Sequence, residues 1–515
     1  MPSPQKETTA KGERNVASKY LRNFKGIYTK AARVAIPEDN FYDLVNVMPI
    51  GPANIHTIPG LSAMLIDYAT DSVYWAEYAN INSTDYQIVF TTNGKVFAYN
   101  IAANTSAQIN VGKLLSGAGS RMDQWKNQLI LFYDVNGYYS WDGTTFTGPI
   151  TGGIIPGGTP VAPDIAVFSN RVWLYSNRVL YVSAINSTTD FTLVSGAIAQ
   201  NLSDPQLRGD STRLYSASGY LYIMGKSSIF VISDVYIPTS ASPPAPVFSV
   251  LNVQAAIGCD QPGSIFTYNR DLCFANTYGL WRLTGVTAEK MSDDIDGTIQ
   301  YLDTSFAISG GAAKVNNVLQ ASFLIKQTGD PIFGTRTIVA NYFDQKWWFA
   351  NYGSLTFVAG AIKNNQPVLF GFIGNKLYQL YQDTTTAPAS SWQTALWPME
   401  DQLADKEVFR AGFEMTVSQI GSSISVNLDT PNRSTPFISG FSVGQVQWVN
   451  NSGAPAQWQN NSSIVVTWYS GSYLLYYADA LGGYGKYVGI SGSIGAGGIY
   501  ELSSIMMDYE LRKRW

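Results

Sequence analysis

The feature of this sequence that most restricts its fold is a hairpin pattern that recurs along its middle. In each copy two short apolar runs flank a turn signal, as around Asn93-Gly94 and Asn136-Gly137. Asn-Gly between apolar runs is the strongest two-residue hairpin signal. Further copies occur at 172–182, 221–232, 272–283 and 368–380, and a weaker copy begins at Val318. The middle of the chain is therefore predicted to be a series of β-hairpins.

The copies recur at a regular spacing. The positions just before them are Tyr86, Asn127, Asn170, Gly219, Asn269, Asn316 and Gln366. Successive positions lie about 40–50 residues apart, which is typical of β-propeller blades of four strands. A single such sheet has two apolar faces, and radial stacking buries each face against a neighbour. We predict an all-β chain with a propeller of six or seven blades, and a run of unrelated hairpins in β-sandwiches stays open as the alternative.

The composition agrees with strands and turns. The chain has 46 Gly and 23 Pro, aromatic residues make up 13% and charged residues only 14%. Soluble domains average about 25% charged residues, and disordered chains combine many charges with few aromatics. These counts exclude a disordered chain and a coiled coil. No run approaches the roughly 18 apolar residues of a membrane-spanning helix, so no membrane span is predicted.

The residues that usually carry chemistry are scarce. His56 is the only histidine, and Cys259 and Cys273 are the only cysteines. Nucleophilic serine or cysteine catalysis usually needs a histidine base, and zinc sites usually need histidine or several cysteines. We therefore predict no catalytic residue, no metal and no cofactor, a turn position for His56, and two buried free thiols. Catalysis by a pair of carboxylates is not excluded by inspection, since the chain has 37 acidic residues.

For three segments, both a functional site and an ordinary structural element are possible interpretations. Residues 292–300, followed by Asp303, space acidic side chains as a calcium loop does, but strand-like neighbours favour a plain acidic turn. Trp347-Trp348 fits a strand of a blade, and a sugar-stacking platform is the alternative. Residues 239–246 are Pro- and Ser-rich. They fit an inter-blade loop, and a docking loop for a fibre or spike is the alternative.

Basic residues concentrate near the two ends of the chain. The net charge is −4, which predicts no broad face for nucleic acid. Residues 1–33, however, hold eight Lys or Arg and two Glu. We interpret this segment as an arm without regular structure that contacts an acidic partner or DNA, and a solvated tail is the alternative. The candidate contact residues are Lys6, Lys11, Arg14, Lys19, Arg22, Lys25, Arg512, Lys513 and Arg514.

The two ends also carry a family resemblance. Residues 23–60 have a Lys-Gly-Ile opening, an Ala-Ile-Pro step, an Asn-Val strand and a closing Pro-Gly, and residues 487–515 contain Glu-Leu-Ser-Ser-Ile and end on a basic run and Trp. Together with a central propeller, this resembles the tail nozzle of short-tailed bacteriophages, also called the tail accessory or packaged-DNA-stabilising protein. The matched positions are Phe24, Gly26, Pro37, Asn46, Pro59, Gly60, Glu501, Ser503 and Trp515.

The resemblance implies an architecture. It places the propeller, at 61–398, inside a β-sandwich-like platform built from 1–60 and 399–515. Six copies would form a virion ring below the portal and adaptor, assembled in the host cytoplasm. The ring would dock fibres or spikes and surround a channel for retention and ejection of double-stranded DNA, without sequence recognition.

The resemblance supplies no catalytic residue, so no enzyme activity is predicted. A glycan-binding or glycan-cleaving propeller and a cellular propeller scaffold remain alternatives, because propellers carry many functions. A propeller that binds or cleaves glycans would need carboxylates and aromatic residues clustered at the propeller axis.

Overall fold

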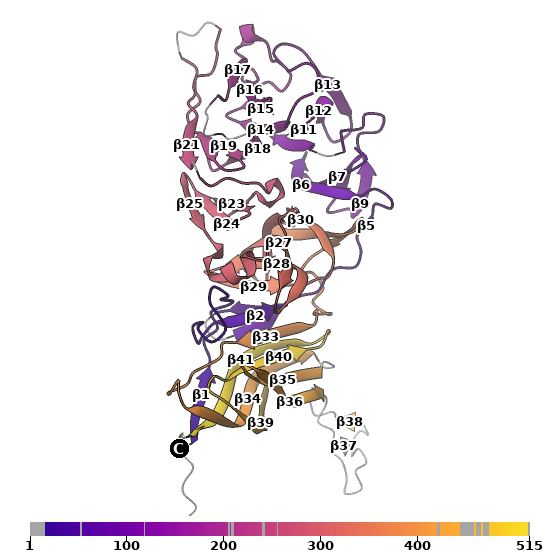
Figure 1. Cartoon of the computed structure of the whole chain (residues 1–515). Helices are drawn as coiled ribbons and strands as arrows, with labels where there is room; N and C mark the ends of the chain where they lie inside the picture. Colours follow the sequence, from indigo (N-terminus) through magenta and orange to yellow (C-terminus); the bar gives the residue numbers. More distant parts are fainter. Residues whose placement is uncertain are drawn as a thin grey trace, which may run out of the picture. The chain divides into compact units, whose positions relative to one another are not determined.

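The computed structural model divides the chain into two compact units (Figure 1). Residues 58–384 form the propeller unit, and the residues before 58 and after 384 form the platform unit. The boundaries expected from the sequence were 60 and 398. The structure describes residues 16–51, 54–117, 119–203, 207, 211–238, 243–254, 256–419, 423–442, 458–459, 465–466 and 473–512.

In its described residues the propeller unit contains seven sets of four antiparallel strands, which we call blades 1 to 7, and six of them are separate four-stranded sheets. Blade 1 contains β6 (Val73–Ile81), β7 (Thr84–Thr91), β8 (Val96–Asn100) and β9 (Thr105–Gln108). Blade 2 contains β10 (Arg121–Trp125), β11 (Leu129–Asp134), β12 (Gly137–Trp141) and β13 (Phe146–Ile150). Blade 3 contains β14 (Asp164–Phe168), β15 (Arg171–Ser176), β16 (Val179–Val182) and β17 (Ile198–Asn201). Blade 4 contains β18 (Ser211–Ala217), β19 (Tyr220–Gly225), β20 (Ile229–Ile232) and β21 (Leu251–Gln254). Blade 5 contains β22 (Phe266–Tyr268), β23 (Asp271–Asn276), β24 (Gly279–Thr284) and β25 (Thr287–Lys290). Blade 6 contains β26 (Ser309–Val315), β27 (Val318–Asp330), β28 (Gly334–Phe343) and β29 (Lys346–Ala350). Blade 7 contains β30 (Leu355–Lys363), β31 (Gln366–Ile373), β32 (Lys376–Gln379) and β5 (Ile66–Asp67).

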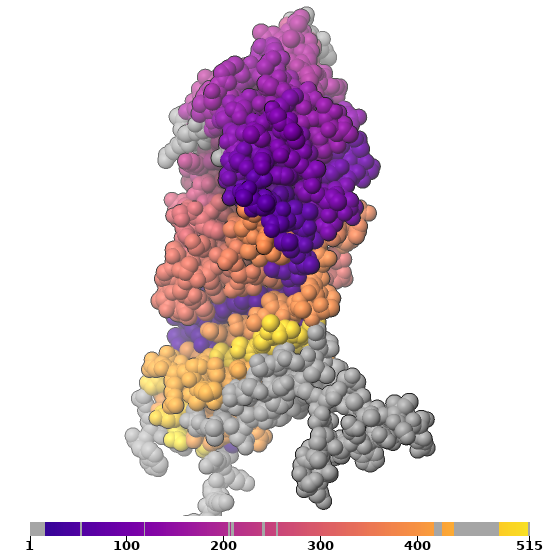
Figure 2. Space-filling model, turned by 90° about the vertical axis from the view of Figure 1, so that its right-hand side faces the viewer, coloured from indigo at the N-terminus to yellow at the C-terminus, as the bar shows by residue number. Residues whose placement is uncertain are grey.

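The seventh blade is completed by the start of the unit. Its strand β5 precedes blade 1 in the chain and pairs with β32, with Ile66 opposite Leu377. The Leu65 N–H donates to the Leu377 carbonyl oxygen over 2.9 Å. Figure 2 shows the first blade, in indigo, beside the orange last blade. The sequence left six or seven blades open, and the described residues of this unit form seven.

The hairpins form where local turn chemistry favours them. Several tight turns have positive φ at both central residues, as at Asn177-Arg178 and Asn316-Asn317. Positive φ at both positions is the geometry of type I′ turns, whose twist matches that of a hairpin. Asn tolerates this region better than other residues with a side chain. Thus, although Asn-Gly guided the sequence interpretation, Asn followed by another residue makes several of the actual turns.

The blades bury apolar residues on both faces. Trp173, Leu214 and Phe230, for example, belong to one buried cluster shared by blades 3 and 4. Cys259 and Cys273 are buried and form no disulfide, as predicted. Burial raises the pKa of the Cys259 thiol to about 12, so this thiol is protonated at neutral pH and unreactive.

The platform unit joins the two ends of the chain in two antiparallel sheets, as in a β-sandwich. One sheet contains β1 (Val16–Leu21), β3 (Val47–Ile50), β4 (Asn54–Thr57), β34 (Asp405–Gln419), β39 (Tyr473–Gly485) and β41 (Ile499–Arg512). The other contains β2 (Phe41–Val45), β33 (Ser390–Thr394), β35 (Ser423–Thr430), β36 (Arg433–Ser442) and β40 (Gly489–Ile494), and β37 (Trp458–Gln459) pairs with β38 (Val465–Val466).

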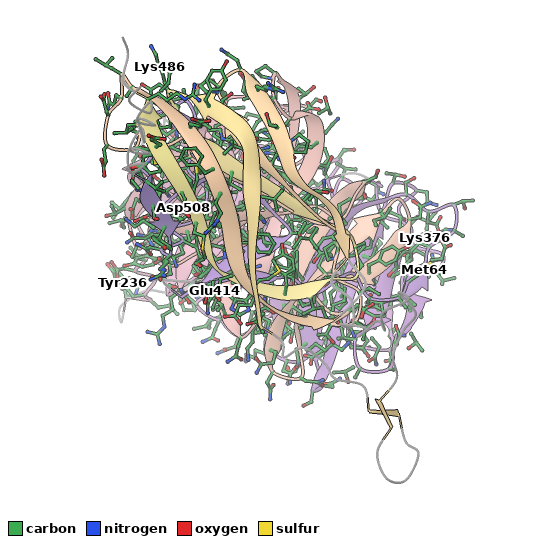
Figure 3. The ribbon with its side chains drawn as sticks, turned by 90° about the horizontal axis from the view of Figure 1, so that it is seen from below. Met64, Tyr236, Lys376, Glu414, Lys486 and Asp508 are labelled. Atoms are coloured by element: carbon green, nitrogen blue, oxygen red, sulfur yellow. The ribbon has the colours of Figure 1, made fainter. Side chains whose placement is uncertain are left out.

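Strands from the two ends pair directly. The early strands β1 and β4 both pair with β41, and β2 pairs with β33. The long strands β34 and β41 run side by side, and Figure 3 labels Glu414 and Asp508 on them. The Ser504 hydroxyl donates to the Glu414 carboxylate over 2.8 Å. The all-β fold with a propeller inserted in a platform of both ends is therefore present.

Two local predictions were wrong. Residues 16–21, expected to lack regular structure, form β1 along β41. His56, expected in a turn, lies in β4 opposite Glu501. In both segments the local pattern was weak, and the edge of β41, more than 400 residues later in the chain, supplies the hydrogen-bond partners that make them strands. Within the described residues, no helix has the length and apolarity needed to cross a bilayer.

Candidate functional site

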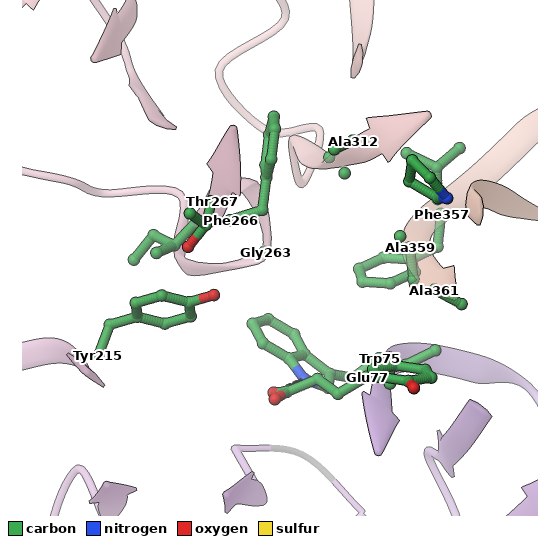
Figure 4. Close-up of a pocket in the computed structure, with 18 of the residues that line it drawn as sticks. Trp75, Glu77, Tyr215, Gly263, Phe266, Thr267, Ala312, Phe357, Ala359 and Ala361 are labelled. Atoms are coloured by element: carbon green, nitrogen blue, oxygen red, sulfur yellow. Dashed lines mark hydrogen bonds between the residues drawn. The ribbon is translucent and has the colours of Figure 1, made fainter. Parts of the chain in front are cut away.

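The candidate site lies at the hub of the propeller, where the first strands of the blades meet. A cavity of about 400 Å³ opens there between β6, β18, β22, β26 and β30. Figure 4 shows Trp75, Glu77, Tyr215 and Thr267 extending into a common space. Phe357 and the small side chains of Ala312, Ala359 and Ala361 lie on the side opposite Tyr215.

Two arginines lie against the indole ring of Trp75 at the hub. Arg213 of β18 forms an ion pair of 2.9 Å with Glu77 of β6, and these side chains are 6% and 19% exposed. Its guanidinium carbon lies 4.9 Å from the centre of the Trp75 ring. The guanidinium carbon of Arg121, from β10, lies 4.5 Å from the same ring. Both distances fit cation–π contacts, which are strongest with Trp and away from water.

Two aspartates at the hub accept hydrogen bonds from the backbone of the neighbouring blade. Asp123 of blade 2 accepts from the backbone N–H of Val167 in blade 3 over 2.6 Å. Asp164 of blade 3 accepts from the backbone N–H of Leu214 in blade 4. Burial raises the pKa of Asp123 to about 7, although these backbone hydrogen bonds oppose the rise. Burial likewise raises the pKa of Asp164 to about 6, against the charge of Arg213. These carboxylates are engaged within the protein and hold the ring of blades together.

The raised pKa values predict that the chain becomes more stable as the pH falls from about 8 to about 6. In the unfolded chain both aspartates titrate near 3.9, so in this window the folded state binds more protons than the unfolded state. The thermal unfolding temperature, measured by calorimetry at several pH values, should therefore rise with acidification. The lowered pKa of His56, caused by its burial, acts in the opposite direction at the acidic end of this range.

A matched variant isolates the aspartate effect. Asp123→Asn cannot take up a proton, so its unfolding temperature should depend less on pH over the same range than that of the wild type. Asp303 serves for the control variant Asp303→Asn, because its pKa is lowered to about 2 by hydrogen bonds from Ser305 and Lys326, far below the window. An unfolding temperature that stays flat or falls on acidification in the wild type would contradict the prediction.

The walls of the cavity are mainly apolar. Phe266 of β22 and Phe357 of β30 are buried, and glycines of β26 and β30 bring their backbones close to the cavity. At Gly311 an added Cβ would lie 2.4 Å from the backbone nitrogen of Gly360, so neighbouring blades approach here closer than any side chain allows. The Tyr215 and Thr267 hydroxyls and the Glu77 carboxylate are the polar groups beside Arg213. This arrangement can hold a small molecule that is partly apolar and hydrogen-bonding.

Four of the nine predicted basic residues lie in the described part of the chain, and each of them contacts a neighbouring side chain of this chain. In the described part of the chain, Lys19 pairs with Glu38, Lys25 lies 3.4 Å from Asp39, and Arg512 forms a 2.6 Å ion pair with Glu407. Arg22 lies over the Tyr20 ring at 4.9 Å. The other predicted contacts, Lys6, Lys11, Arg14, Lys513 and Arg514, lie outside the described residues.

The calcium-like segment 292–300 is an acidic turn. It forms two short helical turns, Ser292–Ile295 and Asp296–Ile299. The Lys290 ammonium lies 2.6 Å from Asp296, and Asp303 pairs with Lys326 at 3.0 Å. Lysine occupies the place that a cation would take, and the described residues contain no cluster of His, Cys, Asp or Glu suited to a metal.

The structure also bears on the Trp347-Trp348 pair and on the loop 239–246. Trp347 and Trp348 lie in β29 and are 1% and 0% exposed, so the strand interpretation is confirmed and a sugar-stacking platform at this pair is excluded. In the loop 239–246, residues 239–242 lie outside the described residues. The rest of that loop includes Pro244, whose carbonyl oxygen an added Cβ at Gly196 would meet at 2.3 Å, so it packs on blade 3.

The hub residues were missed by the sequence analysis. Glu77, Asp123, Asp164 and Arg213 each stand in the first strand of a blade. Charged residues recurring in the first strand of successive blades would have been the signal. It was not used because the repeat was aligned on the hairpins that follow these strands.

No protein-family model matches the chain, and a search of curated protein sequences gives no significant match. Solved structures similar to it include that of U3-55K, with 9% identity, 63% of this chain and 98% of that chain covered, and a TM-score of 0.38. The RRP9 WD40 repeats match with 9% identity over 63% and 99%, and a TM-score of 0.39. The extracellular domain of BT4673 from B. thetaiotaomicron matches with 10% identity over 64% and 41%, and a TM-score of 0.37. All three TM-scores lie below 0.5, so these similarities carry no argument about this chain.

Proposed function

We propose that this protein is a non-enzymatic ring subunit of a short-tailed bacteriophage tail, the nozzle below the portal and adaptor. The observation that carries the proposal is the platform unit, in which β1 and β4 from the start of the chain pair with β41 from its end. The nozzle resemblance of the two end segments implies a platform of this construction. The resemblance covers the residues of β4 and β41, including Glu501 in β41, whereas β1 lies before the matched segment 23–60.

The composition supports an assembly role. A ring subunit must bury large areas against its neighbours, and interface cores are rich in aromatic residues and poor in charges. The chain has 32 Tyr, 24 Phe and 13 Trp with only 14% charged residues. A channel for DNA also needs a wall that does not hold phosphates, because each Lys or Arg contact adds salt-dependent affinity. A chain of net charge −4 meets that requirement.

The basic residues suggest where a partner contacts the chain. Lys19, Lys25 and Arg512 have carboxylate partners within the platform, so their charges are already balanced. We therefore place the proposed contact to the adaptor or to DNA on Lys6, Lys11 and Arg14, which precede β1. Fibres or spikes are proposed to dock on the same virion ring.

The test is the oligomeric state and location of the protein. Mass photometry and electron microscopy of the purified full chain, alone and mixed with portal–adaptor complexes, should show a closed ring, with six copies expected. Particles should carry that ring on the tail axis. A chain that stays monomeric under both conditions and is missing from particles would overturn the proposal.

A charge-matched pair of variants tests the arm. Replacing Lys6, Lys11 and Arg14 by Gln should weaken ring attachment to the adaptor and reduce its dependence on salt, because rim charges mainly steer association. The control replaces the exposed propeller residues Lys226, Arg270 and Lys314 by Gln, which changes the net charge equally. Equal losses in both variants would assign the effect to net charge and not to the arm.

A further inference from the structure

The hub cavity of the propeller has the properties of a small-molecule site that the proposed tail function does not use. Its volume of about 400 Å³ lies within the range of roughly 300–1,000 Å³ for ligand pockets. Its lining comes from five blades, so a ligand would contact strands and not mobile loops. Thr267 and Ile362 of this lining are exposed, which places the opening beside them.

The charges around the cavity favour a neutral ligand. Glu77 is paired with Arg213, so neither offers a free charge to an ion. The Arg121 guanidinium lies on the Trp75 ring. Asp123 is bound by backbone N–H groups. A phosphate would meet the Glu77 carboxylate, and an ammonium group would meet Arg213, so both would be repelled by one member of the pair.

The polar groups of the cavity also disfavour a purely apolar ligand. Among the described residues, Arg213 and Trp75 both donate to Glu77 Oε1, which leaves Oε2 able to accept another hydrogen bond. The Arg213 Nε–H is buried and has no partner among the described residues. An apolar ligand would cover Glu77 Oε2 and the Tyr215 hydroxyl without offering either of them a hydrogen bond, which is costly.

A hydroxyl group is both donor and acceptor, so it can donate to Glu77 and accept from Arg213 at the same time. The faces of a sugar ring carry C–H groups that pack on aromatic and aliphatic walls such as Phe266 and Phe357. We propose that the hub cavity binds a neutral saccharide, with Glu77, Arg213 and Tyr215 contacting its hydroxyls. A free disaccharide and the end of a polysaccharide chain offer the same chemistry.

The first experiment measures binding by the intact full-length chain. Saturation-transfer difference NMR and calorimetry are carried out with maltose, cellobiose, lactose and chitobiose. Amylose and cellulose oligomers, free and capped at the non-reducing end, form a second arm. At least one disaccharide should bind with a dissociation constant of about 1 mM or tighter. Loss of oligomer binding on capping would assign the site to chain ends, and retained disaccharide binding alone would assign it to free saccharides.

Variants tie the binding to the cavity. Ala312→Leu fills the space opposite Tyr215 and should abolish binding. Tyr215→Phe removes one hydroxyl and should weaken binding by up to about tenfold. Tyr278→Phe is the matched control, because Tyr278 is 72% exposed on blade 5 and does not line the cavity. Circular dichroism verifies the fold of each variant, and Tyr215→Phe carries the test if Ala312→Leu does not fold.

The proposal is overturned if none of the four disaccharides binds at roughly 10 mM. It is also overturned if Tyr215→Phe and Tyr278→Phe affect binding equally. Neither result bears on ring formation, since the tail function rests on the platform unit.

Discussion

Arg213→Met is expected to lower the free energy of unfolding of the propeller by about 3–5 kcal/mol. Arg213 is 6% exposed and forms an ion pair with Glu77. Removing the cation leaves the Glu77 carboxylate and its neighbours Asp123 and Asp164 in a poorly hydrated hub without their main counter-charge. The cost of an uncompensated buried charge exceeds the value of the lost contact itself. Urea unfolding followed by tryptophan fluorescence measures the change.

The matched control is Arg282→Met in blade 5. Arg282 also pairs with a glutamate, Glu289, at 2.7 Å, but the two side chains are 34% and 62% exposed. Exposed pairs of this kind contribute about 0–1 kcal/mol, so the control should unfold nearly as the wild type does. If Arg213→Met and Arg282→Met destabilise the chain equally, the hub pair does not have the role assigned to it.

Tyr68→Ala is expected to destabilise the propeller by about 3–5 kcal/mol, as large aromatic truncations in cores do. Tyr68 follows β5 and is 4% exposed. Its ring lies 5.1 Å from that of Phe97 in blade 1 and 6.4 Å from that of Phe372 in blade 7. The side chain therefore packs on both sides of the junction where the ring of blades closes.

The control for Tyr68→Ala is Tyr278→Ala, which removes an exposed ring of the same size. Surface substitutions usually change stability by no more than about 0.5 kcal/mol. Hydrogen exchange adds a test specific to closure, because in Tyr68→Ala the amides of β5, β32 and blade 1 should lose protection first. Uniform loss of protection over all seven blades would contradict a role at the junction.

The hub shows why charged residues persist inside the propeller. A buried ion pair is often no more stabilising than apolar residues of similar size. Here, however, Asp123 and Asp164 accept backbone N–H groups of the next blade, and Arg213 balances their charge. The two aspartates thus connect neighbouring blades, and Arg213 also lines the cavity proposed to bind saccharide.

Features that depend on residues close together in the chain could be predicted from the sequence, and features that depend on distant residues could not. Hairpins such as the one around Asn136-Gly137 depend on residues adjacent in the chain, so local turn chemistry was sufficient to place them. The burial of Trp347 and Trp348 also followed from their position in a blade. The hub pair of Glu77 and Arg213 was not predicted, because 136 residues separate its members. The recurrence of charged residues in the first strands indicates the hub but does not say which of them pair.

The amino-acid sequence by itself determined the strands, their turns and the repeat, since backbone preferences and apolar alternation act over a few residues. The tertiary structure decided how many blades there are, because Ile66 completes the last blade by pairing with Leu377. It also decided that the weakly patterned segments at 16–21 and 54–57 are strands, because β41 offers them an unpaired edge. The physical reason is that edge pairing and charge balance are satisfied by groups distant in the chain, and only the folded molecule brings those groups together.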